Sequence, residues 1–126
     1  MHPDFTLQAQ VDKYGHYVPG FVYIASPYTH ASSEVMQARF EAAEAYVAQQ
    51  LRLGRHVYSP IVHCHALASK YTLPTDAEYW RAYNYAMLAK AMVLEILMLD
   101  GWQESVGVKG EQEYAVFCNI PVQYAA

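Results

Sequence analysis

The architecture of this chain follows from residues 93–115, VLEILMLDGWQESVGVKGEQEYA, in which three kinds of segment follow one another. The stretch begins with an apolar run, breaks at Asp100-Gly101 and continues through a loop that contains Ser105 and Gly107. A short apolar run bounded by turn residues predicts a buried strand. The residues after the loop have a helical pattern, which predicts a helix with Glu111 in its first turn.

A strand, a loop and a helix in this order predict a ligand-binding edge. In parallel sheets, ligands bind where the loops leave the carboxyl ends of the strands. A helix N-terminus beside such a loop offers free N–H groups and a partial positive charge. An acidic side chain and a hydroxyl at that place can act on an anionic, sugar-containing ligand. The alternative is that Glu111 only complements the helix dipole, and this stretch alone favours that alternative.

The totals restrict the class of protein. A chain of 126 residues with 54% apolar composition fits one domain with a substantial core. The net charge of −4 argues against a nucleic acid polymer as partner, because a phosphodiester backbone requires a basic face. Cys64 and Cys118 are isolated, which predicts reduced thiols and a cytoplasmic protein. No signal peptide or membrane-spanning run is expected, so no membrane partner is predicted.

The order of predicted elements defines the fold class. The alternation of strands with helices predicts an α/β protein with a parallel sheet and right-handed crossovers. Residues 1–20 are interpreted as an N-terminal arm, and 21–126 as the single domain. A capping box at Thr75 and Glu78 is expected to open one helix. The predicted strands are 21–26, 56–59, 92–99 and 121–124, and the predicted helices are 33–51, 63–71, 75–90 and 108–118.

Metal and cofactor motifs are absent or incomplete. His63-Cys64-His65 offers donor atoms, but a zinc site needs three or four ligands and no second cluster supplies the rest. The first predicted strand ends in Ser26-Pro27 rather than in a glycine-rich dinucleotide fingerprint, and no Walker sequence is present. We therefore predict neither a metal nor a cofactor. Trp80 and Trp102 are each interpreted as core or as the wall of a pocket.

Three segments together resemble the nucleoside 2-deoxyribosyltransferase-like superfamily, particularly a bacterial branch of small proteins. They are residues 23–28 (YIASPY), 79–88 (YWRAYNYAML) and 100–111 (DGWQESVGVKGE), the last followed by Ala115. The superfamily also contains nucleoside 5′-monophosphate N-glycosidases. Its hallmark is G-x-x-x-E with an alanine four residues later, which corresponds here to Gly107, Glu111 and Ala115. The resemblance implies a three-layer Rossmann-like or flavodoxin-like parallel sheet with helices on both faces.

The resemblance also implies a chemistry. In that family the glutamate attacks the anomeric carbon of the sugar, the base departs, and water or a second base resolves the glycosyl ester. Glu111 is the matching residue, and the mechanism is that of a retaining glycosidase. Tyr23 and Tyr28 correspond to residues that line the base or sugar pocket. Trp102 and Gly107, in the site loop, are further candidates for substrate binding.

Two serines direct the choice of substrate. Transferases that act on free nucleosides have an aspartate where this chain has Ser105, whereas the monophosphate hydrolases have a serine that donates to phosphate. Ser26 matches a second serine that those hydrolases use at the phosphate. The resemblance therefore predicts a nucleoside 5′-monophosphate as substrate.

One position departs from the family pattern. The helix before the third strand usually carries an aspartate that positions the ribose or protonates the leaving base, and the corresponding residue here is Asn84. An amide can form hydrogen bonds but cannot act as a general acid. A neighbouring acid can substitute for it, and the candidates are Asp76, Glu78 and Asp100.

The resulting expectation is hydrolysis or transfer at the N-glycosidic bond of a (deoxy)nucleoside 5′-monophosphate. Glu111 is the expected nucleophile, and Asn84 is expected to orient the sugar or base. The protein is expected to be a homo-oligomer, a dimer or tetramer. The alternatives are a deoxyribosyltransferase acting on free nucleosides, a non-catalytic nucleotide-binding module, and a structural self-associating protein that uses the chain's 12 tyrosines.

Overall fold

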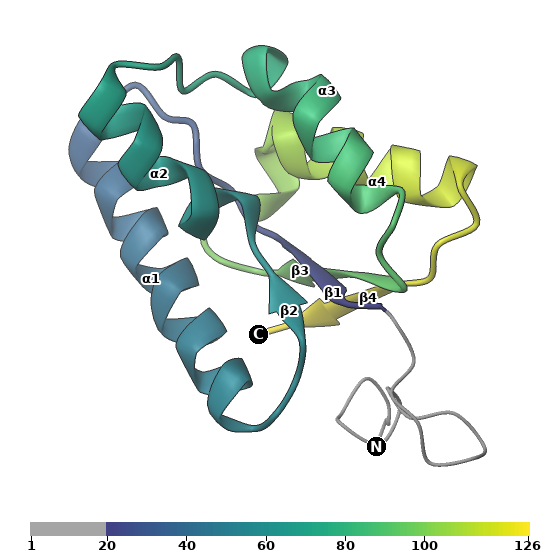
Figure 1. The fold of residues 1–126 in the computed structure, drawn as a ribbon. Helices are drawn as coiled ribbons and strands as arrows, with labels where there is room; N and C mark the ends of the chain where they lie inside the picture. Colours follow the sequence, from purple (N-terminus) through teal and green to yellow (C-terminus); the bar gives the residue numbers. More distant parts are fainter. Residues whose placement is uncertain (1–19) are drawn as a thin grey trace.

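Four parallel strands and four α-helices make up the part of the chain that the computed structural model describes, residues 20–126. The predicted N-terminal arm, apart from Gly20, lies outside these residues. The elements follow one another in the order of Figure 1: β1 (Val22–Ala25), α1 (Ser33–Arg52), β2 (Val57–Tyr58), α2 (Pro60–Tyr71), α3 (Ala77–Leu88), β3 (Val93–Leu97), the short 3₁₀ helix η2 (Trp102–Glu104), α4 (Val106–Phe117) and β4 (Val122–Ala125).

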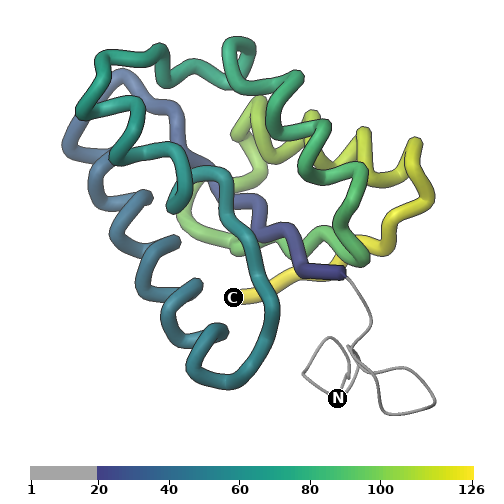
Figure 2. Tube along the Cα trace, viewed as in Figure 1, coloured from purple at the N-terminus to yellow at the C-terminus, as the bar shows by residue number. Residues whose placement is uncertain are grey.

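The strand order in the sheet is β2-β1-β3-β4, and all pairs are parallel. The chain moves from β1 outward to β2 and then crosses back over β1 to β3, as the trace in Figure 2 shows. This is the start of the flavodoxin-like order, and its direction reverses between β1 and β3. Such a switch point leaves a crevice at the carboxyl ends of the two strands, where α/β proteins bind their ligands.

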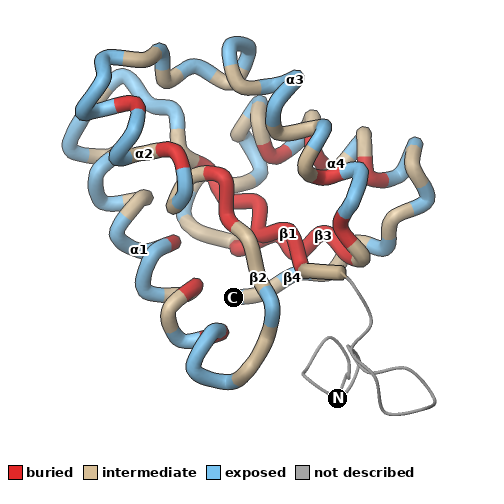
Figure 3. The backbone as a smooth tube through the Cα atoms, viewed as in Figure 1, coloured by how far each residue is buried: buried red, intermediate tan, exposed pale blue. Residues whose placement is uncertain are grey.

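Helices cover both faces of the sheet, which gives the three-layer α/β fold that the sequence predicts. Tyr23 and Ala25 of β1 pack with residues of α3 and α4, including Leu88 and Val108. The alternate residues of β1 and β3 form a second cluster against Tyr46 of α1. Figure 3 shows that burial concentrates along β1 and β3, which are covered on both faces. Strands covered on both faces are continuous apolar runs in sequence, as these largely are.

Each helix starts at a side-chain cap, although three of the predicted starts were wrong. The helix α2 begins at Pro60, capped by Ser59, rather than at residue 63. Asp76, not Thr75, caps α3, because its Oδ2 accepts a hydrogen bond from the Tyr79 N–H at 3.0 Å. Ser105 caps α4, with the Val108 N–H 3.2 Å from its Oγ. The helix therefore begins two residues earlier than predicted. Glu111 consequently lies beyond the first turn, outside the range in which the helix dipole acts on a charge.

None of the helices in the described part of the chain is both long enough and apolar enough to cross a lipid bilayer. The longest, α1, has 20 residues. Its buried residues are Ala43, Val47 and Gln50. The neighbouring Leu51 is 55% exposed, and the polar Gln50 takes the inward position instead.

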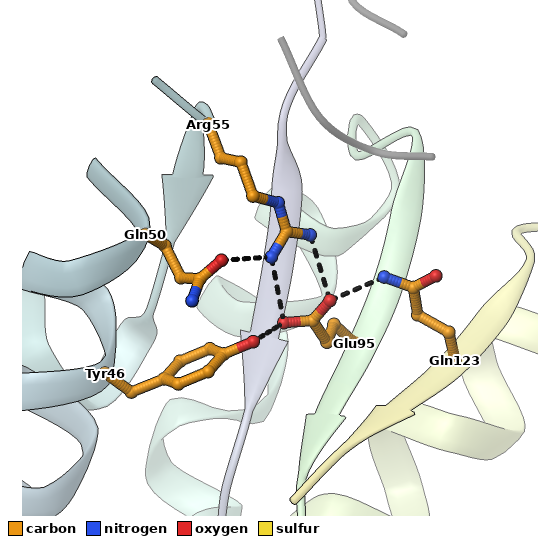
Figure 4. A network of polar contacts seen from close by, with 5 residues as sticks. All are labelled: Tyr46, Gln50, Arg55, Glu95 and Gln123. Carbon is orange, nitrogen blue, oxygen red and sulfur yellow. Dashed lines mark hydrogen bonds and ion pairs between the residues drawn. The ribbon is translucent and has the colours of Figure 1, made fainter. Parts of the chain in front are cut away.

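Gln50 points inward because it belongs to a polar network at the α1 face of the sheet, drawn in Figure 4. Its centre is Glu95, a buried residue of β3 that interrupts the run interpreted as apolar. The Glu95 carboxylate accepts hydrogen bonds from Arg55, at 2.9 Å, from Gln123, at 2.5 Å, and from Tyr46. Gln50 in turn accepts from Arg55 at 2.5 Å. A buried carboxylate is tolerated only with partners of this kind, and these link α1, β3 and β4.

We predict that Glu95→Ala destabilises the fold by about 3–5 kcal/mol, because it leaves the Arg55 guanidinium without its buried counter-charge. Urea unfolding at neutral pH measures the change. The control is Glu44→Ala, which removes an exposed glutamate of α1 and should change the free energy of unfolding by less than about 0.5 kcal/mol. Equal effects of the two substitutions would show that the network does not stabilise the fold.

Candidate active site

A cavity of about 460 Å³ lies at the carboxyl edge of the sheet, at the switch point between β1 and β3. Its lining combines the loop after β1, the residues that open α4, and the facing sides of α2 and α3. This volume falls in the range of small-molecule sites. The candidate site residues that line it are Ser26, Tyr28, Asn84, Ser105, Gly107 and Glu111.

Glu111 is the most perturbed acid of the site. It is 6% exposed, and its Oε2 accepts a hydrogen bond of 2.5 Å from the Tyr23 hydroxyl. Burial raises the pKa of Glu111 to about 7, although the hydrogen bond from Tyr23 lowers it. Burial and the neighbouring carboxylate raise the pKa of Tyr23, so the phenol keeps its proton and remains a donor. Tyr23 does not line the cavity, so its hydrogen bond to Glu111 comes from the core and not from the cavity.

A carboxyl group with a pKa near 7 is suited to chemistry at neutral pH. It is partly ionised there and can serve as a nucleophile or as a general acid–base. Among the described residues, the Glu111 carboxylate has one hydrogen-bond partner, Tyr23, so it keeps lone pairs available for a substrate. Buried, perturbed acids in clefts are more frequent at functional sites than elsewhere.

Two buried polar atoms in the cavity wall lack hydrogen-bond partners among the described residues. They are the hydroxyl oxygen of Ser26, a residue 6% exposed, and Oδ1 of Asn84. Buried polar atoms are satisfied in the great majority of cases, so an exception requires an explanation. Both atoms belong to residues that line the same cavity as Glu111.

The start of α4 adds donors to this group. Ser105 Oγ accepts from the Val108 N–H, so its own proton is free to be donated. A Cβ atom at Gly107 would lie 3.7 Å from Ala77, an ordinary contact. At Gly110, however, a Cβ would lie 2.7 Å from the Tyr85 hydroxyl. A side chain at Gly110, which the sequence interpretation did not select, would therefore require the Tyr85 ring to shift.

Trp102 packs against the core rather than into the cavity. Its ring packs at the edge of the main core cluster, with its centroid 5.8 Å from that of Tyr124, and it is not among the residues that line the cavity. Trp80 lines the cavity instead, with its indole N–H donating to the Pro74 carbonyl at 2.8 Å. Of the two interpretations of Trp102, its position agrees with core packing, because η2 turns this side chain towards Tyr124 of β4.

Sequence reasoning also missed His65 as a residue of the cavity. It considered the His-Cys-His motif for metal binding and favoured structural or surface histidines, whereas the helix directs the two rings apart and places His65 at the cavity. The His65 ring stacks on Phe40 at 4.0 Å, while the His63 ring lies parallel to Tyr83 at 6.4 Å. Within residues 20–126, no group of three or more His, Cys, Asp or Glu side chains could hold a metal ion.

A second cavity, of about 350 Å³, lies between α3 and α4. It shares Arg81, Asn84, Gly107 and Glu111 with the first cavity and adds Lys109 to its lining. Glu111 therefore lies where two cavities meet. Of the acids considered as substitutes for Asn84, Asp76 and Glu78 line the first cavity, whereas Asp100 does not.

The fold and site define an α/β protein with a ligand-sized cavity built around a buried glutamate. The sequence matches the model of the family described as a domain of unknown function, DUF1937, over residues 20–126. The chain belongs to this family, and the matched region contains every residue of the site. A search of curated proteins found no match.

We predict that Glu111→Gln becomes progressively more stable relative to the wild type as pH rises. The folded-state pKa is raised from 4.5 to about 7, so folding favours the protonated acid, and its contribution to stability is lost as the pH rises through about 7. Between pH 4.5 and pH 8 the difference between variant and wild type should increase by about 3 kcal/mol. Urea unfolding at both pH values measures it.

The matched control is Glu113→Gln, on the same helix but exposed. Its stability relative to the wild type should remain nearly constant over the same pH range. If Glu111→Gln behaves like this control, the carboxyl of Glu111 is not buried as described.

Proposed function

We propose that this protein cleaves the N-glycosidic bond of a (deoxy)nucleoside 5′-monophosphate, or transfers its sugar, with Glu111 as the nucleophile. The observation that supports this most is a buried glutamate with a pKa of about 7 in a cavity that also contains the hydroxyls of Ser26 and Ser105. The resemblance to the nucleoside 2-deoxyribosyltransferase-like superfamily points to the same residues.

The proposed reaction proceeds in two steps. The ionised Glu111 attacks C1′ of the sugar and forms a C–O bond, while the C1′–N bond breaks and the base leaves with the electron pair and then takes up a proton. Water, or an acceptor base, then attacks C1′ and loses a proton to solvent, while the C1′–O bond to Glu111 breaks and the carboxylate is regenerated. Tyr23 holds one carboxylate oxygen by its 2.5 Å hydrogen bond, which orients the other towards the substrate.

The 5′ end fits the start of α4. Ser105 has a proton free to donate, and the unpaired hydroxyl of Ser26 lines the same cavity. The first N–H groups of α4 add partial positive charge, and Arg81 adds a cation to the cavity wall. These donors and the Arg81 cation support a phosphorylated substrate over a free nucleoside, against the repulsion of Asp76, Glu78 and Glu104 in the same lining.

Asn84 is proposed to position the sugar. Its Oδ1 is buried, unpaired among the described residues and adjacent to the cavity. It can accept a hydrogen bond from a sugar hydroxyl but cannot supply a proton. Asn84 is therefore also the residue that favours the second candidate function, a nucleotide-binding module without catalysis.

Self-association remains part of the proposal. Val116 and Phe117, near the end of α4, are 66% and 80% exposed. Large apolar side chains exposed next to one another often belong to interfaces between subunits. They support a homo-oligomer, without deciding between a dimer and a tetramer.

We predict that the protein releases free base from deoxynucleoside 5′-monophosphates and that Glu111→Gln abolishes this release. The loss should exceed about a hundredfold, because the amide is not a nucleophile. Chromatography of the free base measures the rate, and a thermal shift with nucleotide confirms that the variant still binds. Wild-type rates in Glu111→Gln would refute the role of Glu111, whereas nucleotide stabilisation without any base release would favour the binding module.

Ser105→Asp should weaken use of the monophosphate while leaving the fold intact, since aspartate is also a good helix cap. We expect KM for the monophosphate to rise about tenfold or more, because a carboxylate repels phosphate and removes a donor. Ser32→Asp, the same change at the cap of α1 outside the cavity, is the control and should leave KM unaltered. Equal KM values for the two variants would contradict the assignment of the 5′-phosphate to Ser105.

A further inference from the structure

A chain of hydrogen bonds leads from the surface of α1 to the cavity. Gln37 donates through Nε2 to Glu41 Oε2 at 3.0 Å, and its Oε1 lies 3.1 Å from His65 Nε2. The other ring nitrogen, His65 Nδ1, lies 2.7 Å from the Tyr28 hydroxyl. Tyr28 and His65 both line the cavity. These hydrogen bonds all donate in one direction, because the outermost group is the Glu41 carboxylate, which can only accept.

The direction follows from which groups can donate. A carboxylate only accepts, so the Gln37 amide must turn its NH₂ group to Glu41 and its carbonyl oxygen to His65. In the tautomer that fits this arrangement, His65 Nε2 carries the ring proton and Nδ1 is an acceptor. The Tyr28 hydroxyl therefore donates its proton to His65.

The imidazole is held in this orientation by packing. The ring of Phe40 stacks on His65 with a centroid distance of 4.0 Å and an interplanar angle of 16°. Burial raises the pKa of Tyr28, so the phenol stays protonated at neutral pH. With its single proton committed to His65, the Tyr28 oxygen offers only lone pairs to a ligand in the cavity.

We infer that Tyr28, oriented by His65, makes the cavity selective for nucleobases with an exocyclic amino group. This inference depends on the proposed function, because it takes the ligand to be a nucleotide. The 5′ end and C1′ are assigned to the α4 side of the cavity, at Ser105 and Glu111. The base then extends towards α2, where Ile61 and Cys64 provide an apolar wall beside Tyr28 and His65.

An amino group and a carbonyl at the same ring position differ in what they offer Tyr28. The amino group of cytosine or adenine donates a hydrogen bond to the phenol oxygen. The carbonyl of uracil or hypoxanthine places a second acceptor against it, with no proton between the two oxygens. A site that leaves polar groups unpaired rejects the mismatched ligand strongly.

The test compares two matched pairs, dCMP with dUMP and dAMP with dIMP, by isothermal titration. Binding is measured in the Glu111→Gln variant so that the nucleotides stay intact. We expect each amino nucleotide to bind about tenfold more tightly than its carbonyl partner. In the same background, His65→Phe keeps the ring against Phe40 but frees the Tyr28 proton, and the preference should fall to about twofold or less.

Two further variants make the result specific. Tyr28→Phe removes the acceptor and should also abolish the preference. His63→Phe changes a histidine on the same helix that does not line the cavity, and it should retain the preference. The inference is overturned if the members of each pair bind equally, if the carbonyl nucleotides bind more tightly, if His63→Phe loses the preference as His65→Phe does, or if no nucleotide binds.

The proposed function can fail separately. Wild-type protein that binds amino nucleotides preferentially but releases no base would contradict the N-glycosidase proposal and support the inference. Base released by the wild type, combined with equal affinities within each pair, would support the N-glycosidase proposal and contradict the inference.

Discussion

The hydrogen bond between Tyr23 and Glu111 is the contact on which the candidate site depends. It joins the second residue of β1 to the interior of α4 across the switch point of the sheet. Tyr23 is fully buried in the main core cluster, so its hydroxyl has a fixed position. The strand order that places β1 beside β3 also brings the residues after both strands to one cavity. The fold thereby holds one carboxylate in a desolvated place and directs it at a ligand-sized space.

A comparison of the two buried glutamates shows why Glu111 stands out. Glu95 is surrounded by Arg55, Tyr46 and Gln123, which neutralise its charge and occupy its oxygens. Glu111 has the single hydrogen bond from Tyr23, no cation in contact among the described residues, and a cavity on its open side. The first arrangement stabilises the fold. The second costs stability when the acid ionises and is typical of sites that act on a substrate.

The sequence predicted the fold well because the fold depends on local patterns. The apolar runs of β1 and β3, the serine cap at Ser32, and the left-handed residues Gly54 and Asn119 each follow local rules. The site was predicted in part, since six of its residues were expected from motif order and do line the cavity. Their roles remain proposals.

The remaining features depend on contacts between residues distant in sequence. The residues next to Glu95 in sequence do not predict its ion pair with Arg55. Those next to Trp102 do not predict that η2 turns the indole ring towards Tyr124. The partnership of His65 with Tyr28 joins residues 37 positions apart. The first-turn placement of Glu111 failed for a simpler reason, because Ser105 caps α4 earlier than its periodic pattern begins.

Mass spectrometry of the quenched reaction tests the central claim most directly. Wild-type protein is mixed with a deoxynucleoside 5′-monophosphate, stopped with acid within the first turnover and digested with a protease. The account predicts a deoxyribosyl 5-phosphate group attached to the side chain of Glu111. Base release with an inverted sugar product and no such group on the protein, or the group attached to a different residue, would contradict it.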